Sequence, residues 1–130
     1  MRTPERLPEK INELVHSMNT GGRLEIDVET EGFMTPEDEE LELAIYRIVQ
    51  EQLNNIVKHA RATRVLIRLS VESLFIVLTV ADNGVGFDVG RHRKGVGITN
   101  IISRAELFNG RVDIQSAPGE GCTLSVSLPM

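Results

Sequence analysis

The stretch Asp82-Asn83-Gly84-Val85-Gly86 directly follows the apolar run Leu74 to Ala81, and the fold can be inferred outward from it. The apolar run predicts a buried strand. A carboxylate at the end of that strand can accept hydrogen bonds, and the glycines let a ligand approach the backbone. The adenine amino group suits such a site, although the same residue types also form ordinary turns. The neighbouring segments decide between these two interpretations.

The segments around this stretch alternate between helical and strand patterns. Apolar residues at helical spacing predict helices over residues 4–19, 35–60 and 98–108, the last ended by Asn109-Gly110. The second helix should begin at Thr35-Pro36-Glu37-Asp38, with Thr35 as its hydroxyl cap and the following acids on a solvated face. Alternating or apolar runs predict strands over residues 24–29, 64–71, 74–81, 111–116 and 122–128, the first of them at a sheet edge. Residues 88–94 have the composition of a mobile loop.

This order of elements predicts an α+β fold built as a two-layer α/β sandwich. We expect a mixed sheet of about five strands with three helices on one face. With 130 residues the chain is long enough for one domain and too short for two. Within this domain, residues 1–22 should carry an N-terminal helix, and residues 24–128 should carry the motifs.

Composition excludes several classes of protein. The net charge of −5 and the absence of a Lys/Arg run argue against a nucleic-acid partner. No apolar stretch approaches the roughly 18 residues that suggest a membrane span, and the charged N-terminus does not resemble a signal peptide. We therefore expect a soluble, cytoplasmic domain. The single cysteine, Cys122, should be a small packed residue of a strand.

One side of the long predicted helix is polar. Glu51, Asn55 and His59 recur every four residues, with Lys58 beside them, so all four project within about a third of the helix circumference. Such a stripe can be plain solvated surface, but a carboxylate, a carboxamide oxygen and a lysine also suit Mg²⁺ and a triphosphate. The opposite side should pack on the sheet through Val49, Leu53, Ile56, Val57 and Ala60.

Two further glycine pairs follow. In Lys94-Gly95-Val96-Gly97-Ile98 the glycines open the third predicted helix, where free amides and the helix dipole bind anions. A flexible hinge is the alternative interpretation. Gly119-Glu120-Gly121-Cys122-Thr123 has the pattern of a hairpin turn with a hydroxyl at the start of a strand.

Together and in this order, these segments resemble the ATP-binding domain of sensor histidine kinases, within the gyrase, heat-shock chaperone and histidine kinase ATPase superfamily. The resemblance covers about residues 24–128 and implies the Bergerat-type fold. Residues 51–60 resemble its N box, and residues 82–87, 95–98 and 119–123 resemble its three glycine boxes. Residues 46–51 further resemble the subfamily whose response regulators carry helix-turn-helix domains. The aromatic box found before the lid in many members is missing, leaving only Phe87, and the lid, within residues 88–94, is short.

The resemblance also implies roles for single residues. Asp82 would accept a hydrogen bond from the adenine amino group, Gly86 would let the base approach, and Thr123 would support both through water. Asn55 would hold Mg²⁺, and Glu51 would be the catalytic residue that orients or activates the attacking group. Phosphates would meet the lid and the second glycine box. The implied nucleotide-binding set is Asn55, Lys58, His59, Asp82, Gly84, Gly86, Lys94, Gly95, Val96, Gly97, Ile98 and Thr123.

A histidine kinase phosphorylates a histidine on a dimerisation domain, and none of His16, His59 and His92 has the setting of that phosphoacceptor. The resemblance therefore implies the catalytic domain of a two-component sensor kinase. It would bind Mg²⁺-ATP, hydrolyse it slowly by itself, and donate the γ-phosphate to a histidine outside this chain. A response regulator would be the partner of the parent protein, which could be membrane-anchored. The alternatives are an anti-sigma-factor serine kinase and a non-catalytic interaction module of the same fold.

Overall fold

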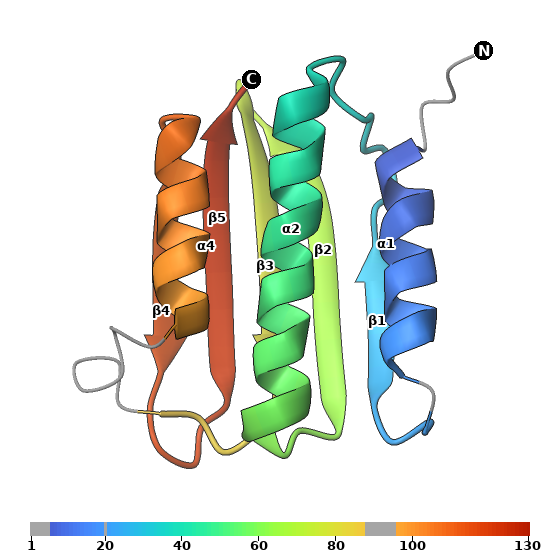
Figure 1. Cartoon of the computed structure of the whole chain (residues 1–130), viewed down its shortest axis with the longest axis vertical. Coiled ribbons are helices and arrows are strands. Elements are labelled where there is room, and N and C mark those ends of the chain that lie inside the picture. Colours follow the sequence, from blue (N-terminus) through green and yellow to red (C-terminus); the bar gives the residue numbers. More distant parts are fainter. Residues whose placement is uncertain (1–5, 20, 88–95) are drawn as a thin grey trace.

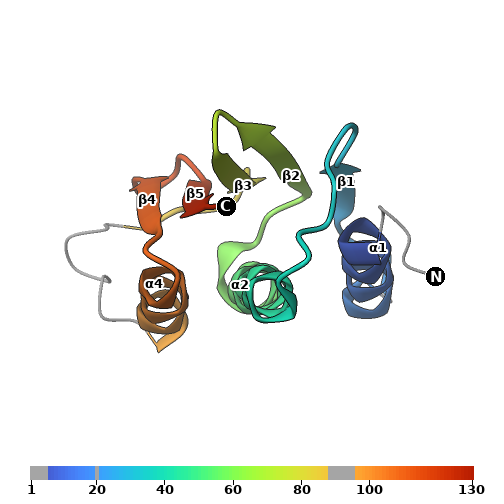
Figure 2. The ribbon, with the colours of Figure 1, turned by 90° about the horizontal axis from the view of Figure 1, so that it is seen from above.

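The computed structural model describes residues 6–19, 21–87 and 96–130. These residues form two layers, with the helices on one face of a sheet (Figures 1 and 2). The helices are α1 (Arg6–Met18), α2 (Glu39–Asn55), the short π-helix η1 (Ile56–Ala60) and α4 (Val96–Leu107). The strands are β1 (Glu25–Glu29), β2 (Arg64–Glu72), β3 (Phe75–Asp82), β4 (Arg111–Ser116) and β5 (Cys122–Pro129). The predicted α+β two-layer architecture is confirmed.

The five strands lie in the order β1-β2-β3-β5-β4. β1 pairs with β2 in parallel, whereas the other neighbouring pairs are antiparallel. The sheet is therefore mixed, as predicted, and β1 lies at its edge, where its alternating acids are exposed. The C-terminal end of β3 and the start of β5 meet at one end of the sheet, because Asp82 pairs with Cys122.

The core lies between the sheet and the helices. Alternate residues of β2, β3 and β5 are buried on the face that the helices cover, and α2 runs over the centre of the sheet (Figure 2). Fully buried side chains of α2 include Ile45, Ile48 and Leu53. Burial of each such side chain stabilises the fold by about 1.5–3 kcal/mol. The apolar side of α2 is therefore held against the sheet, and its polar side faces away.

The N-terminus of α2 differs from the prediction. Asp38, not Thr35, is the N-cap: its carboxylate accepts hydrogen bonds from the backbone N–H of Glu40 at 2.9 Å and of Leu41 at 3.2 Å. The hydroxyl of Thr35 instead accepts a hydrogen bond from the Leu7 N–H at 2.9 Å, near the start of α1. The predicted cap was therefore wrong: Thr35 is engaged by the start of α1, and Asp38, predicted only as part of a solvated acidic face, caps α2.

The helical path continues to Ala60, as predicted, but its last turn is a π-helix. A π-helix has more residues per turn than an α-helix, so it rotates the following side chains away from the α-helical positions. Val57, predicted to pack on the sheet, is instead 50% exposed, and that prediction is wrong. Val49, Leu53 and Ile56 are buried as expected, and Ala60 packs against the core.

The remaining elements follow the sequence closely. Asn109, at a φ of 59°, adopts a left-handed conformation, and the Gly110 N–H donates to the Ala105 carbonyl at 2.8 Å, so this pair ends α4 as predicted. The predicted loop 88–94 lies outside the described residues. Within the part of the chain that the structure describes, no helix combines the length and apolar character needed to cross a membrane.

Candidate functional site

A cavity of about 660 Å³ lies at the end of the sheet where β3 ends and β5 begins. It brings together Asn55 from the end of α2 and Asp82 from the end of β3, which are far apart in the sequence. Its walls combine polar side chains with apolar ones. The lining residues are Glu51, Gln52, Asn54, Asn55, Ile56, Lys58, His59, Ala60, Asp82, Gly86, Phe87, Ile98, Ile114, Cys122 and Leu124.

Asp82 is held in place by the turn that follows it. Its Oδ1 accepts a hydrogen bond from the Gly84 N–H at 2.8 Å. Burial raises the pKa of the Asp82 carboxyl, while the bond from Gly84 acts in the opposite direction. The other carboxylate oxygen has no hydrogen-bond partner among the described residues, so it can accept from a ligand in the cavity.

The first glycine turn is locked between two other segments. The Val85 N–H donates to the Ala60 carbonyl at 2.7 Å, and the Gly119 N–H donates to the Val85 carbonyl at 2.5 Å. A Cβ on Gly84 would collide with Ala60, so Gly84 serves packing and is not among the cavity-lining residues. Gly86 does line the cavity, at a φ of +66°, and a Cβ there would collide with the Ala117 carbonyl. These contacts explain why the two positions need glycine.

Asn83 fixes the same turn from the opposite side. Its Oδ1 accepts hydrogen bonds from the backbone N–H of Thr63 and of Arg64, both at 2.9 Å. The sequence did not predict this role of Asn83, because an Asn in an Asp-Asn-Gly turn carries no signal of a distant partner. Its side chain ties the end of β3 to the start of β2.

The polar stripe faces the cavity. Asn55 donates through Nδ2 to Gln52 Oε1 at 3.3 Å, which leaves the Asn55 Oδ1 as a hard oxygen acceptor. Half-buried Glu51 accepts a hydrogen bond from Asn100 of α4 at 3.4 Å. The described residues contain no cluster of three or more His, Cys, Asp or Glu side chains that could hold a metal by themselves. A magnesium ion here would therefore depend on Asn55 together with oxygens of a bound phosphate, which is how Mg²⁺ often binds.

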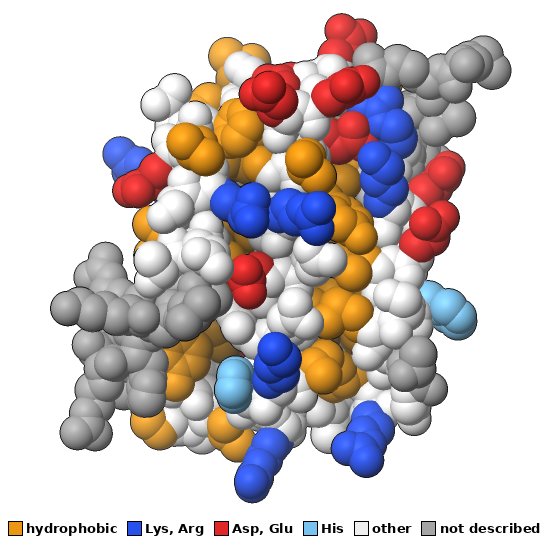
Figure 3. All heavy atoms as spheres, in the orientation of Figure 1, with side chains coloured by type: hydrophobic (Ala, Val, Ile, Leu, Met, Phe, Trp, Pro, Cys, Tyr) orange, Lys and Arg blue, Asp and Glu red, His pale blue; other side chains and the backbone are white. Residues whose placement is uncertain are grey.

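The basic end of the cavity comes from η1. Lys58 and His59 both line the cavity and are exposed to solvent. Figure 3 shows acidic side chains gathered over the N-terminal end of α2 and Lys, Arg and His side chains over its C-terminal end. Ile98, in the first turn of α4, lines the same cavity. The helix N-terminus therefore lies beside it, where free amides attract anions.

Part of the predicted phosphate site cannot be placed. Lys94 and Gly95, like the lid residues Arg91, His92 and Arg93, lie outside the described residues. Val96 and Gly97 form the start of α4, next to Ile98. Phosphate binding by this segment stays a prediction.

The structure contradicts the role predicted for Thr123. Successive side chains of a strand point to opposite faces, and in β5 the buried positions are Cys122 and Leu124, both of which line the cavity. Thr123 lies on the other face and does not line it. The signal was present in the sequence, because Cys122 alternates in register with Leu124, Val126 and Leu128.

Cys122 is the side chain found where Thr123 was expected. It is buried, as predicted for a packed cysteine, and burial, with the nearby Asp82 charge, raises its pKa to about 11. The thiol is therefore neutral at physiological pH. Gln52, which no sequence pattern marked as a site residue, places its Nε2 at 4.0 Å from the Cys122 Sγ.

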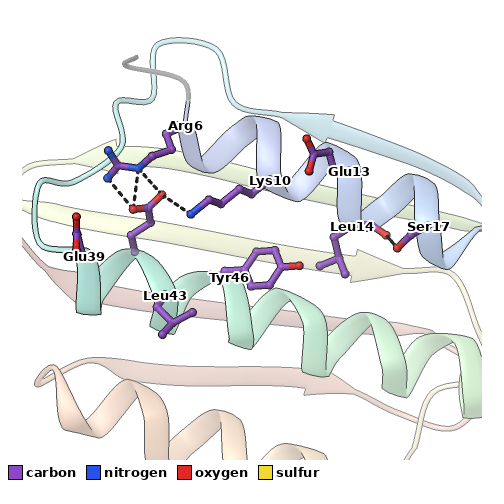
Figure 4. Close-up of a pocket in the computed structure, with 9 residues that line it drawn as sticks. Arg6, Lys10, Glu13, Leu14, Ser17, Glu39, Leu43 and Tyr46 are labelled. Atoms are coloured by element: carbon purple, nitrogen blue, oxygen red, sulfur yellow. Dashed lines mark hydrogen bonds and ion pairs between the residues drawn. The ribbon is translucent and has the colours of Figure 1, made fainter. Parts of the chain in front are cut away.

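A second cavity, of about 850 Å³, lies between α1 and α2 (Figure 4). Its centre is Glu42, which accepts hydrogen bonds from Arg6 Nε at 2.8 and 2.9 Å and from the Arg6 Nη2 at 2.6 Å; Lys10 Nζ lies 3.6 Å away. The bond from Arg6 lowers the pKa of Glu42. The cations are thus engaged by Glu42, and no described residue of the glycine turns lines this cavity, so the smaller cavity is the better candidate for a nucleotide.

Comparisons with known proteins show which family the chain matches. The family model described as "Histidine kinase-, DNA gyrase B-, and HSP90-like ATPase" matches residues 40–130. The sensor histidine kinase ComP of Bacillus subtilis is 33% identical over 127 residues, covering 95% of this chain and 16% of ComP. The oxygen sensor histidine kinase NreB of Staphylococcus carnosus is 38% identical over 95 residues, covering 72% of this chain and 27% of NreB. The chain thus spans only a minor part of these relatives.

The fold has solved counterparts. The histidine kinase domain of the blue-light activated histidine kinase from Erythrobacter litoralis superposes with a TM-score of 0.80 at 22% identity. The superposition covers 95% of this chain and 60% of that structure. At this identity the likeness shows a shared fold.

Proposed function

The chain belongs to the histidine kinase-, DNA gyrase B- and HSP90-like ATPase family, and from this premise we propose that it is the ATP-binding catalytic domain of a two-component sensor histidine kinase. It binds Mg²⁺-ATP and donates the γ-phosphate to a histidine on a dimerisation domain outside this chain. The proposal takes residues 1–130 as one domain, because Leu7, Ile11 and Leu14 of α1 belong to the same core as α2 and the sheet.

The observation that carries the proposal is that Asn55 and Asp82 line one cavity. Its volume of about 660 Å³ lies within the usual range for small-molecule sites, about 300–1,000 Å³. One end offers a carboxylate oxygen without a partner among the described residues, and the other offers the Asn55 carboxamide oxygen and two basic side chains. A ligand with an amino group on an apolar ring and a polyanionic tail matches this distribution.

Each group has a role in this proposal. Asp82 accepts from the adenine amino group, while Ile98, Ile114 and Leu124 supply apolar surface for the ring. Lys58 and His59 meet the phosphates, and Glu51 orients or activates the attacking group. Asn55 holds Mg²⁺, which would neutralise charge on the phosphates during transfer. Because phosphoryl transfer is mainly positioning and charge neutralisation, the domain alone should turn over ATP slowly.

The partners follow from the same proposal. The parent receptor would supply the phosphoacceptor helix, and a response regulator, of the helix-turn-helix class by the resemblance of residues 46–51, would receive the phosphate. ATP and response regulators are cytoplasmic, so this domain would work there. The alternative, an anti-sigma-factor serine kinase, would use a similar nucleotide site. It would transfer the phosphate to a serine hydroxyl of a protein and not to a histidine nitrogen.

Calorimetric titration of the chain with Mg²⁺-ATP and Mg²⁺-GTP tests the site. We expect ATP to bind and GTP, which lacks the adenine amino group, to bind at least tenfold more weakly. Absence of ATP binding would refute the proposal. The acid lability of the phosphate on the autophosphorylated parent protein then separates the classes, since phosphohistidine is acid-labile and phosphoserine is stable in acid. An acid-stable product would favour the serine kinase.

A further inference from the structure

Gln52 is a buried polar residue whose role the proposed function does not include. In the part of the chain that the structure describes, the buried polar or charged side chains are Glu42 and Gln52. Glu42 is paired with Arg6, whereas Gln52, with 5% of its surface exposed, has no charged partner. A buried carboxamide is unfavourable unless both of its ends are hydrogen-bonded, so the contacts of Gln52 indicate what it does.

Both ends of the Gln52 carboxamide are engaged. Its Nε2 lies 4.0 Å from the Cys122 Sγ, and its Oε1 accepts from the Asn55 Nδ2 at 3.3 Å. Sulfur is a weak acceptor and not a competing carbonyl, so it matches the N–H end of the carboxamide. Gln52 therefore presents an oxygen, and not a second N–H group, to Asn55.

This arrangement determines how Asn55 is turned. A carboxamide carries its donor and its acceptor on opposite sides, so an Asn55 that donates through Nδ2 to Gln52 keeps Oδ1 for the cavity. The reverse rotation would bring two carboxamide oxygens, the Asn55 Oδ1 and the Gln52 Oε1, against each other. It would also present N–H groups to a cation, which requires an oxygen ligand.

We propose that Gln52 is a positioning residue that fixes the Asn55 carboxamide with its oxygen toward the cavity and thereby makes Asn55 competent to bind the magnesium of Mg²⁺-ATP. The inference rests on the proposed function and extends it to a cavity-lining residue that acts on the metal site through Asn55. Cys122 of β5 holds the other end of the Gln52 carboxamide. Because Cys122 is also the cross-strand neighbour of Asp82, contacts through Cys122 and Gln52 connect Asp82 at the adenine end with Asn55 at the metal end.

The test is the ratio of ATP affinities measured by calorimetry with Mg²⁺ and with EDTA. Gln52→Met keeps the length and removes the acceptor, so it should lower this ratio about fivefold or more while the affinity in EDTA stays within about twofold. Gln52→Glu should retain most of the ratio, because a carboxyl oxygen still accepts from Asn55. A Gln52→Met variant that weakens binding equally in both buffers would show a packing role and overturn the proposal.

Two further measurements separate this inference from the proposed function. If Asn55→Ala lowers the ratio but Gln52→Met does not, the positioning role of Gln52 is refuted and the metal role of Asn55 is supported. If neither wild type nor Asn55→Ala shows a magnesium-dependent affinity, the proposed function itself fails. In the Asn55→Ala background, Gln52→Met should change the ratio no further, and an additional loss would contradict the proposal.

The metal-free protein gives an independent readout. The side-chain amide resonances of Asn55 in a ¹H–¹⁵N spectrum should shift in Gln52→Met and stay near their wild-type positions in Gln52→Glu. Unchanged resonances in Gln52→Met would show that no bond from Asn55 to Gln52 exists in solution. Thermal unfolding of each variant checks that the fold is retained.

Discussion

Asp82 and Cys122 lie directly opposite each other on β3 and β5, so the carboxylate at the candidate adenine site has a buried thiol as its cross-strand neighbour. The thiol is neutral, because burial and the charge of Asp82 raise its pKa to about 11. The sulfur thus adds a soft apolar surface beside an acceptor that lacks a partner for one oxygen among the described residues. The side chain at position 122 therefore sets the shape of this end of the cavity, and Asp82 provides the hydrogen-bond acceptor for a ligand there.

Asp82→Asn should abolish measurable ATP binding. The substitution keeps the shape but turns one acceptor into a donor that faces the adenine amino group, and losing a charge-assisted hydrogen bond corresponds to about 100-fold in affinity. Calorimetry measures the affinity, and circular dichroism should show an unchanged fold. An affinity equal to that of wild type would refute the adenine assignment.

Asn55→Ala should weaken ATP binding much more with magnesium than with EDTA present. The Asn55 oxygen is the candidate ligand for the ion, so its loss matters only when the ion is bound. Asn12→Ala is a matched control, because Asn12 is an exposed asparagine of α1 that does not line the cavity. Equal losses in both buffers would remove Asn55 as the metal ligand.

Thr123→Val and Cys122→Leu should differ in their effects on ATP affinity. Thr123 lies on the sheet face away from the cavity, so its variant should stay within about twofold of wild type. Leucine at position 122 would project extra volume into the cavity and should lower the affinity about tenfold. If the Thr123 variant loses affinity and the Cys122 variant does not, the resemblance-based assignment of Thr123 was right after all.

Gly86→Ala should destabilise the protein by roughly 1–3 kcal/mol, because alanine must take a positive φ and would collide with the Ala117 carbonyl. Gly21→Ala is the control, since a Cβ there would meet only an ordinary contact with Arg23. Urea unfolding of both variants measures the difference. Equal stabilities would show that the turn can relax without cost.

Glu42→Gln should lower stability in a pH-dependent manner. Hydrogen bonding from Arg6 lowers the pKa of Glu42 in the folded state below its ordinary value of 4.5. The ionised pair therefore stabilises the fold above about pH 4.5, and this stabilisation is lost as the pH falls through the folded-state pKa. Thermal unfolding midpoints of wild type and variant should differ at pH 7 and converge as the pH falls from about 4.5 through the folded-state pKa.

The control for this prediction is Glu13→Gln, because Glu13 is an exposed acid of α1 beside the same cavity. Its variant should follow the wild-type midpoint across the whole pH range, as expected for an isolated surface charge. If the difference in unfolding midpoint between wild type and Glu42→Gln stays constant from pH 7 to pH 3, the stability does not depend on the ionisation of Glu42.

The fold could be predicted from the sequence because its signals are local. Period-2 runs in β2 and β5 and period-3.6 runs in α2 and α4 specify the elements, and Asn109-Gly110 marks the end of α4. The order of the motifs predicted that Asn55 and Asp82 share one site, and in the structure both residues line the same cavity.

The predictions that were wrong, and the residues that were missed, depended on contacts between segments far apart in the sequence. Thr35 was predicted to cap α2, but its hydroxyl accepts from Leu7 near the start of α1, and Asp38 caps α2 instead. Val57 is exposed because the last turn of the helical segment, residues 56–60, is a π-helix. No local sequence pattern predicted this widening. Gln52 and Asn83 looked ordinary until their partners 70 and 20 residues away were known.

The sequence by itself determined the elements, their order and the residues able to bind a nucleotide, since side-chain chemistry and hydrophobic period are properties of short stretches. Only the tertiary structure decided that Cys122 and not Thr123 faces the cavity, and that Gln52 stands between Asn55 and the sheet. The physical reason is that strand register and helix rotation are set by packing across the two layers. A shift of one residue in a strand exchanges the inner face for the outer one.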